Sequence, residues 1–223
     1  MRQFDRLVKI IEKLRSPKGC PWDRAQKVTD YERYLLEEAY ELIEAIRAAK
    51  TEAVKEELGD LFLILAMITQ FYKEKGEFGS AEVLNGICDK LVIRHPHVFG
   101  DKQLKSKDKV LAYWIRHKAK KKNRKTVKDR LPTIAPALLM AEISLKEQHY
   151  LDKIKGRSKS AAAKSLGDDI IRQVKALVGS GAQDKALADL LYDLCRLAFI
   201  HRLQPESLLR AKVLREAARI KYS

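Results

Sequence analysis

Four acidic residues in the first half of the sequence form two pairs with helical spacing. Glu38 and Glu41 make one pair, and Glu57 and Asp60 make the other. Residues three apart lie on one face of a helix, so each pair projects from one side of its helix. If the two helices are antiparallel, a short turn near residues 48–51 would bring both pairs level with each other. The spacing therefore predicts a cluster of four carboxylates.

The residues that continue each pair along its helix predict that these acids face a packed interior. The stripe of the second pair continues through apolar side chains, namely Ile64, Met67 and Phe71. The stripe of the first pair continues through Ala45 and Ala48, whose small side chains let a neighbouring helix approach. Carboxylates about 5 Å apart repel by roughly 3 kcal/mol per pair at an effective dielectric constant of about 20. Such a cluster therefore requires a bound cation.

The donor atoms of the cluster indicate which cation would bind. All four side chains offer carboxylate oxygens, and neither pair contains a His or a Cys. Such a donor set suits Mg²⁺ or Mn²⁺, and it differs from zinc sites and from the Glu-x-x-His sites of di-iron bundles. Mg²⁺ bound by few carboxylates usually completes its coordination shell with water and substrate phosphates. We therefore predict a Mg²⁺ site, with Mn²⁺ as an alternative, flanked by Glu37, Glu44 and Glu56.

The apolar residues of the chain recur with the 3.6-residue period of helices. Helices are expected over residues 2–14, 30–49, 51–75, 80–94 and 110–122. Thr51 is a plausible cap for the third of them, and GCPWD at residues 19–23 is expected to form a turn. No segment shows the alternation of a strand, so the predicted class is all-α.

The second half of the sequence partly repeats the first. Residues 138–151 resemble the first expected helix in period, LGDDIIRQVKAL at 166–177 resembles LLEEAYELIEAI at 35–46, and KALADLLYDLCRLA at 185–198 resembles EELGDLFLILAMIT at 56–69. The chain therefore looks like two copies of one helical unit. We expect a first domain over residues 1–122, a basic linker over 123–135 and a degenerate second domain over 136–223.

The positive charge of the chain lies in its second half. Residues 1–100 contain 16 Lys and Arg against 17 Asp and Glu, although the whole chain of 223 residues has a net charge of +15. A basic half is compatible with nucleic-acid binding. However, the lysine-rich segment 117–130 shows neither a recognition-helix motif nor interleaved aromatic residues. A nucleic-acid-binding or scaffold protein, with a relic site in its first half, is therefore the alternative class.

Other features exclude a membrane protein and argue against secretion. No stretch has the roughly 18 consecutive apolar residues that a membrane span needs. The N-terminal sequence MRQFDRLVKIIEKLR lacks the apolar core of a signal peptide. Cys20, Cys88 and Cys195 lie far apart and match no metal-binding pattern. We expect a cytoplasmic protein with reduced thiols.

Five motifs, which occur in order, carry a resemblance to a known family. They are GCPWD at 19–23, LEEAYELIEAI at 36–46, EELGDL at 56–61, DKL at 89–91 followed by RHPHVFGD at 94–101, and VLAYW at 110–114. Together they resemble the MazG family of nucleoside triphosphate pyrophosphohydrolases. The resemblance implies an all-α bundle that forms homodimers. It also implies Mg²⁺-dependent hydrolysis of nucleoside triphosphates to the monophosphate and pyrophosphate, which would limit surplus or aberrant nucleotides. A narrower preference for dUTP, dCTP or a modified base is the alternative within this chemistry.

The resemblance also implies roles for individual residues. Glu38, Glu41, Glu57 and Asp60 match metal-binding carboxylates, Lys90 and Arg94 match phosphate-contacting positions, and Trp114 and Lys118 match base-stacking and phosphate-contacting positions. One of Glu41, Glu38 and Glu37 would orient the attacking water, and we prefer Glu41. Trp22 is either a packing residue of its loop or a wall of the nucleotide pocket. His95 and His97 are interpreted as a helix terminus with satisfied imidazoles.

The second copy departs from the family pattern at its acidic positions. Asp169 and Asp189 remain, but Arg172 and Ala186 stand where the first copy has Glu41 and Glu57. An arginine among the remaining acids would supply the positive charge that a metal supplies elsewhere. The second copy is therefore expected to be catalytically silent and to serve dimerisation or polyanion binding, although Arg215 and Arg219 preserve the basic pair.

Overall fold

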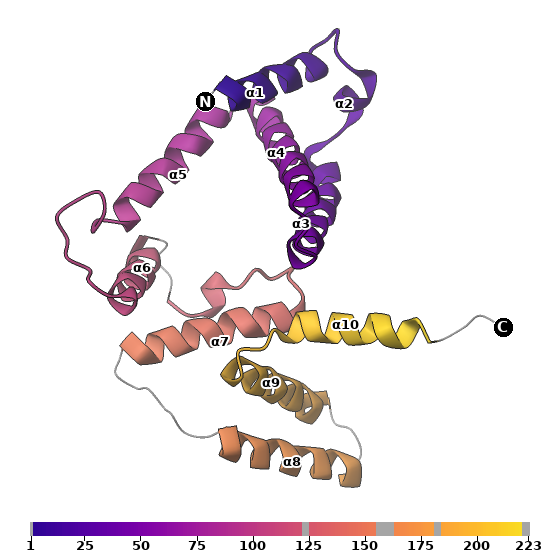
Figure 1. Cartoon of the computed structure of the whole chain (residues 1–223), viewed down its shortest axis with the longest axis vertical. Coiled ribbons are helices and arrows are strands. Elements are labelled where there is room, and N and C mark those ends of the chain that lie inside the picture. The colour runs from indigo at the N-terminus through magenta and orange to yellow at the C-terminus, as the bar shows by residue number, and fades with distance from the viewer. Residues whose placement is uncertain (1, 122–124, 155–162, 181–183, 220–223) are drawn as a thin grey trace. The chain divides into compact units, whose positions relative to one another are not determined.

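The computed structural model describes residues 2–121, 125–154, 163–180 and 184–219 as helices joined by turns (Figure 1). None of these residues belongs to a strand, so the predicted all-α class is confirmed. The chain divides into two compact units, Met1–Lys102 and Gln103–Ser223. No helix in the described ranges is long and apolar enough to cross a membrane. The three cysteines are free thiols.

The first unit contains most of the helices that the sequence predicts. Its elements are α1 (Arg2–Arg15), α2 (Pro21–Ala25), the 3-10 helix η1 (Val28–Asp30), α3 (Tyr31–Arg47), α4 (Thr51–Glu74) and α5 (Ser80–Arg94). We expected Thr51 to cap α4, but that prediction was wrong. Thr51 is the first helical residue of this helix, and Lys50 occupies the N-cap position without a side-chain hydrogen bond. The GCPWD segment is more than a turn, because Pro21 starts the short helix α2 at a position that proline favours.

Helices α3 and α4 form a hairpin that carries the core of the first unit. Their connection turns at Ala49, whose φ of 52° is left-handed, and the Lys50 N–H donates to the Ala45 carbonyl at 3.2 Å. This arrangement satisfies the end of α3 in the manner of a helix C-cap. The buried core residues are Ile11, Tyr31, Ile64, Ala66, Met67 and Phe71. Burial of one face of α4 therefore fixes which side of the hairpin faces the interior.

Arg15, at the end of α1, ties three helices of the first unit together. Its guanidinium donates to both carboxylate oxygens of Glu74 on α4, at 2.8 and 2.7 Å. It also donates to the Asp23 carbonyl on α2 at 2.5 Å and lies 3.8 Å from the centre of the Phe71 ring. The Arg15 side chain is only 8% exposed and that of Glu74 is 34% exposed, so these contacts are partly shielded from water. We call this arrangement the Arg15 clamp.

The second unit is built around helix α9. Its elements are α6 (Lys107–Lys121), the 3-10 helix η2 (Lys128–Arg130), α7 (Ala137–Ile154), α8 (Ala163–Ser180), α9 (Asp184–Ile200) and α10 (Pro205–Ala217). Helix α9 packs against α8 and α7, and Leu166, Ile170 and Leu190 form the buried core of the α8–α9 pair. Helix α6 groups with this unit, although we expected it to end the first domain. The expected domain limits and the duplication remain predictions.

Part of the expected linker, 123–135, is attached to the second unit. The Asp129 carboxylate accepts hydrogen bonds from the backbone N–H groups of Lys125 and Thr126, both at 2.8 Å. Arg130 forms an ion pair with Glu147, a buried carboxylate on α7. A buried carboxylate needs such a partner, so this pair anchors η2 to α7.

Candidate functional site

Three of the four predicted acidic residues come together on the α3–α4 hairpin. Glu38 and Glu41 on α3 and Glu57 on α4 each offer a carboxylate oxygen, and these oxygens lie within 4.8 Å of one another. Asp60, one helical turn beyond Glu57, lies outside this group of three, but its charge acts on Glu38. We call Glu38, Glu41, Glu57 and Asp60 the acidic cluster.

The cluster lies at the edge of the helix–helix interface. Ala45, one turn along α3 from Glu41, is buried and leaves room for the close approach of α4. Glu38 and Glu57 are half-buried, whereas Glu41 is exposed. The expected inward stripe of α4 is also confirmed, because Ile64, Met67 and Phe71 are all buried. The acidic cluster therefore borders the core on one side and is accessible to solvent at Glu41.

The electrostatics of the cluster favour binding of a cation. Burial raises the pKa of the Glu38 carboxyl above its ordinary value, and the charges of Asp60 and Glu41 raise it further. A hydrogen bond between Glu38 and Glu57 acts on this pKa in the same direction. A divalent cation would relieve this repulsion, and an all-oxygen donor set suits Mg²⁺ or Mn²⁺. The residues present therefore fit the predicted metal.

Glu37, one of the three predicted catalytic glutamates, lies next to the cluster but has a cationic partner. Arg33 donates from Nε to Glu37 Oε1 at 2.8 Å, one helical turn away on α3. We did not anticipate this pair, although a basic and an acidic residue four apart on a helix are its usual sequence signal. The Glu37 carboxylate is therefore already engaged by a cation of its own helix.

Four of the predicted substrate-binding residues lie on two helices, α5 and α6. Lys90 and Arg94 are half-buried, one turn apart on α5, and α5 packs against α4. Trp114 is half-buried on α6 and belongs to the second unit. Lys118 also belongs to α6, but its side chain lies outside the described residues. The roles of these four residues remain predictions.

Two further predictions from the sequence concern ring side chains of the first unit. Trp22 on α2 is 68% exposed, which does not fit the alternative in which it packs inside the unit. His95 makes a 2.7 Å hydrogen bond through Nδ1 with the Leu91 carbonyl, as expected for a satisfied helix terminus. In contrast, Nδ1 of His97 is buried without a hydrogen-bond partner among the described residues. The interpretation of the His-Pro-His turn is therefore confirmed for His95 alone.

Comparison with known proteins places the acidic cluster within a family domain. Residues 26–99 match the model of the MazG nucleotide pyrophosphohydrolase domain. This range contains the whole acidic cluster together with Lys90 and Arg94, whereas Trp22, Trp114 and Lys118 lie outside it. The matched domain therefore coincides with the hairpin and with α5.

Whole-chain comparisons give the same assignment. A Thermotoga maritima protein named nucleoside triphosphate pyrophosphohydrolase/pyrophosphatase MazG is 34% identical over 207 residues, which are 93% of this chain and 80% of the relative. An Escherichia coli protein named nucleoside triphosphate pyrophosphohydrolase is 38% identical over 146 residues, 64% of this chain and 56% of the relative. The uncharacterized protein YabN of Bacillus subtilis is 39% identical over 62% of this chain and 29% of its own length. The chain therefore belongs to the MazG nucleotide pyrophosphohydrolase family.

Proposed function

We propose that this protein hydrolyses nucleoside triphosphates to nucleoside monophosphates and pyrophosphate at the acidic cluster, with Mg²⁺ as its cofactor. The observation that carries the proposal is the approach of three carboxylate oxygens, from Glu38, Glu41 and Glu57, within 4.8 Å. The family match supports the reaction class, and the names of the relatives supply the substrate class.

The side chains of the first unit divide into two groups in this mechanism. The acidic cluster would bind the metal, which when present supplies the positive charge that phosphate oxygens need. Glu41 is our preferred residue to orient the attacking water, because it is the exposed member of the group of three. Glu38 and Glu37 are the alternatives, and the Arg33 pair makes Glu37 the weaker one. Lys90 and Arg94 would bind the phosphates and stabilise the leaving pyrophosphate.

The proposal includes a homodimer formed through the first unit. The apolar side chains that this unit exposes on α4 and α5 are Leu58, Phe62, Leu63, Leu65, Val83, Leu84, Ile87, Leu91, Val92 and Ile93. Apolar surface on this scale usually marks an interaction site. Burying it against the same helices of a second copy would also give Lys90 and Arg94 a packed environment. The predicted cytoplasmic location remains a prediction.

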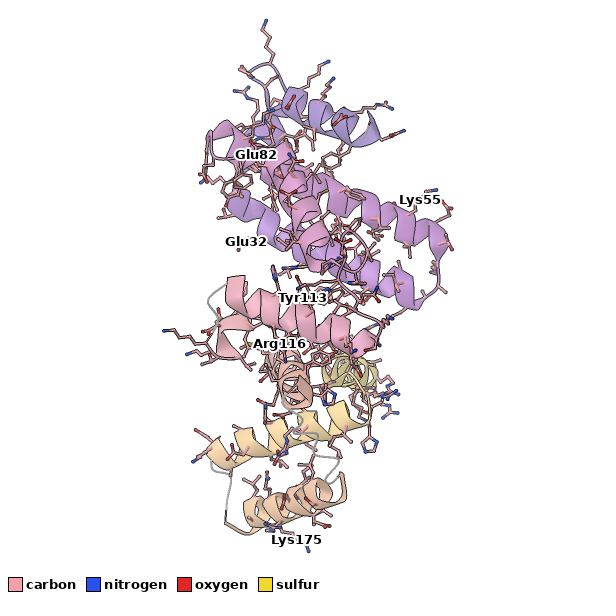
Figure 2. The ribbon with its side chains drawn as sticks, turned by 90° about the vertical axis from the view of Figure 1, so that its left-hand side faces the viewer. Glu32, Lys55, Glu82, Tyr113, Arg116 and Lys175 are labelled. Atoms are coloured by element: carbon pink, nitrogen blue, oxygen red, sulfur yellow. The ribbon has the colours of Figure 1, made fainter. Side chains whose placement is uncertain are left out.

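Product analysis tests the reaction. The full chain is incubated with each NTP and dNTP, with and without Mg²⁺, and the products are separated by ion-exchange chromatography. We expect Mg²⁺-dependent release of monophosphate and pyrophosphate, abolished by Glu41→Ala and retained by Glu32→Ala. Glu32 is a matched control because it is an exposed glutamate of the same helix, outside the acidic cluster (Figure 2).

The same experiment separates the proposal from its alternatives. The order of rates across nucleotides would identify a narrower preference, such as dUTP or dCTP. Turnover that survives Glu41→Ala would contradict the assignment of the site. A protein that hydrolyses no nucleotide, but binds polynucleotides in a strongly salt-dependent way with or without Glu41, would instead be the nucleic-acid-binding alternative.

A further inference from the structure

The α8–α9 pair of the second unit contains an ion pair at the position that matches part of the acidic cluster. Arg172 donates from its guanidinium to Asp169 Oδ1 at 2.8 Å, one helical turn away on α8. Helices α8 and α9 pack against each other, and so do α3 and α4. This acidic side chain therefore already has a cationic partner within the chain.

The sequence register relates the two helix pairs position by position. Aligning residues 166–177 with 35–46, and 185–198 with 56–69, places Asp169 at Glu38, Arg172 at Glu41, Ala186 at Glu57 and Asp189 at Asp60. Two carboxylates of the four therefore remain in the second unit. One lost carboxylate has become a methyl group, and the other has become a permanent cation, because arginine stays protonated in proteins.

The positions around the cluster are also less acidic in the second unit than in the first. In the first unit, the four cluster positions and the flanking positions 37, 44 and 56 are all acidic. Their seven counterparts in the second unit are three aspartates, three basic residues and one alanine, so their formal charges cancel. Lys175, the counterpart of Glu44, lies exposed on α8 (Figure 2). The negative charge that attracts a divalent cation to the first hairpin is therefore missing from the second.

The two hairpins also differ in how their acids are satisfied. In the first hairpin the carboxylates of Glu38, Glu41 and Glu57 lie close together. On α9, in contrast, Asp193 accepts hydrogen bonds from Gln173 at 2.8 Å and from Arg196 at 2.7 Å. Among the described residues, Glu38, Glu41 and Glu57 form the group of side chains that lie close enough together to hold a metal. The described part of the second unit contains no such group.

We propose that Arg172 is a built-in counter-cation, which neutralises the remnant carboxylate site of the second unit and makes this unit independent of divalent metal. A guanidinium donates hydrogen bonds to carboxylate and phosphate oxygens, but it does not activate a bound water molecule as a metal ion does. The second hairpin would therefore preserve the fold while excluding the cofactor. The inference rests on the proposed metal site of the first unit.

Direct titration of the full chain with Mn²⁺, with free Mn²⁺ measured by electron paramagnetic resonance, tests this proposal. Glu38→Gln/Glu41→Gln should weaken binding by about 100-fold or more, because the second unit contributes no site. Adding Arg172→Glu and Ala186→Glu to that variant rebuilds four carboxylates on α8 and α9. We expect this change to restore binding to within about tenfold of the unmodified chain.

A matched control changes the same charges without rebuilding the site. The control adds Lys175→Glu and Ala188→Glu to the Glu38→Gln/Glu41→Gln variant. Like the rebuilt variant, it replaces one basic residue and one alanine of α8 and α9 with glutamate. We expect it to leave Mn²⁺ binding weak, since Lys175, at a flanking position, and Ala188 are both exposed and neither is one of the four positions that match the acidic cluster. Circular dichroism monitors folding. If the rebuilt variant fails to fold, Arg172→Glu alone, at a side chain 77% exposed, replaces it and should give intermediate binding.

Each outcome identifies which idea fails. Binding that persists in Glu38→Gln/Glu41→Gln and disappears with Asp169→Asn/Asp189→Asn would overturn the proposal, because the second unit would then hold metal. Equal binding by the rebuilt variant and its control would also overturn it, because Arg172 would not be what excludes the cation. If the unmodified chain binds no Mn²⁺, the proposed metal site of the first unit is wrong. The comparison of the rebuilt variant with its control still tests whether Arg172 excludes the cation.

Discussion

The α3–α4 and α8–α9 hairpins both have a buried apolar core but differ in charge, because the first has an acidic cluster and the charges at the matching and flanking positions of the second cancel. Ile64 and Met67 are buried on α4, and Leu166 and Ile170 on α8 are buried with Leu190 on α9. The first hairpin brings three carboxylates together, whereas an aspartate of the second pairs with Arg172. The buried residues of both pairs are therefore similar in kind, and a few positions beside them set the difference in charge.

The largest expected difference between the hairpins is in activity. Glu57→Gln should lower kcat by about 10³-fold, which is typical when a group that stabilises charge in the transition state is lost. Asp189→Asn, on the helix that matches α4, should leave kcat unchanged within about twofold. Steady-state pyrophosphate release measures both. Equal losses in the two variants would mean that both hairpins take part in the reaction.

Metal should stabilise the first hairpin and not the second. Mg²⁺ at 100 times its dissociation constant should raise the free energy of unfolding of the first unit by about 2.7 kcal/mol. The sequence has two tryptophans, so Trp114→Phe leaves Trp22 on α2 as a fluorescent reporter of this unit. Urea titrations with and without Mg²⁺ give the stabilisation, which Glu57→Gln should remove and Asp189→Asn should not. Stabilisation that survives Glu57→Gln would place the metal elsewhere.

Two ion pairs allow a comparison of a shielded arginine, Arg15, with a half-exposed one, Arg196. Arg15→Ala should lower the free energy of unfolding by about 2 kcal/mol, between the values typical of exposed and of buried pairs, because it removes two charged hydrogen bonds and leaves Glu74 with Gln70 alone. The Arg196 side chain is half exposed in its pair with Asp193. Arg196→Ala should therefore lower the free energy of unfolding by less than about 1 kcal/mol. Urea unfolding of each variant measures the difference. Arg15→Lys should retain part of the stability, and equal costs at both sites would contradict the importance of shielding.

The smallest expected effects, below about 1 kcal/mol, concern pH and have opposite signs in the two units. The pKa of Glu38 is raised, mainly by burial, so the metal-free first unit should lose stability as pH rises above the ordinary value of 4.5. Burial acts to raise the pKa of Asp193, but Gln173 and Arg196 outweigh it and lower this pKa. Stability from Asp193 should therefore be present above the ordinary value of 3.8 and be lost as pH falls through the lowered value.

Neutral variants test these signs in EDTA. Glu38→Gln should make the metal-free protein more stable at pH 7, whereas Asp193→Asn should make it less stable. Urea unfolding between pH 3 and pH 7 gives both pH profiles. A metal-free protein that Glu38→Gln destabilises at pH 7 would show that the acidic cluster is not repulsive.

The sequence was sufficient to predict features that depend on local periodicity. The helix expected over residues 80–94 has the same bounds as α5, and the stripe from Glu57 to Phe71 faces the core as expected. The approach of Glu38, Glu41 and Glu57 followed from the three-residue spacing and the short turn. These predictions succeeded because a helix converts spacing along the chain into direction in space.

Features that depend on contacts distant in sequence could not be predicted in this way. Arg15 and Glu74 are 59 residues apart, and nothing in their local sequence indicates that they meet. The exposure of Trp22 depends on how α2 lies within the first unit, which periodicity does not determine. Asp60 was predicted to join the cluster of carboxylates from its spacing to Glu57. Its charge does act on Glu38, but its carboxylate lies outside the group of three.

The Arg15 clamp also has a consequence for the order of folding. The α3–α4 hairpin closes through a short turn, whereas the clamp must bring together residues separated by 59 positions. Closing a longer loop costs more chain entropy, so local contacts usually form earlier. We therefore expect α1 to dock after the hairpin has formed, on the native side of the folding barrier. Loss of the clamp would then accelerate unfolding and leave the refolding rate nearly unchanged, so that its stabilising effect is mainly a longer lifetime of the folded state.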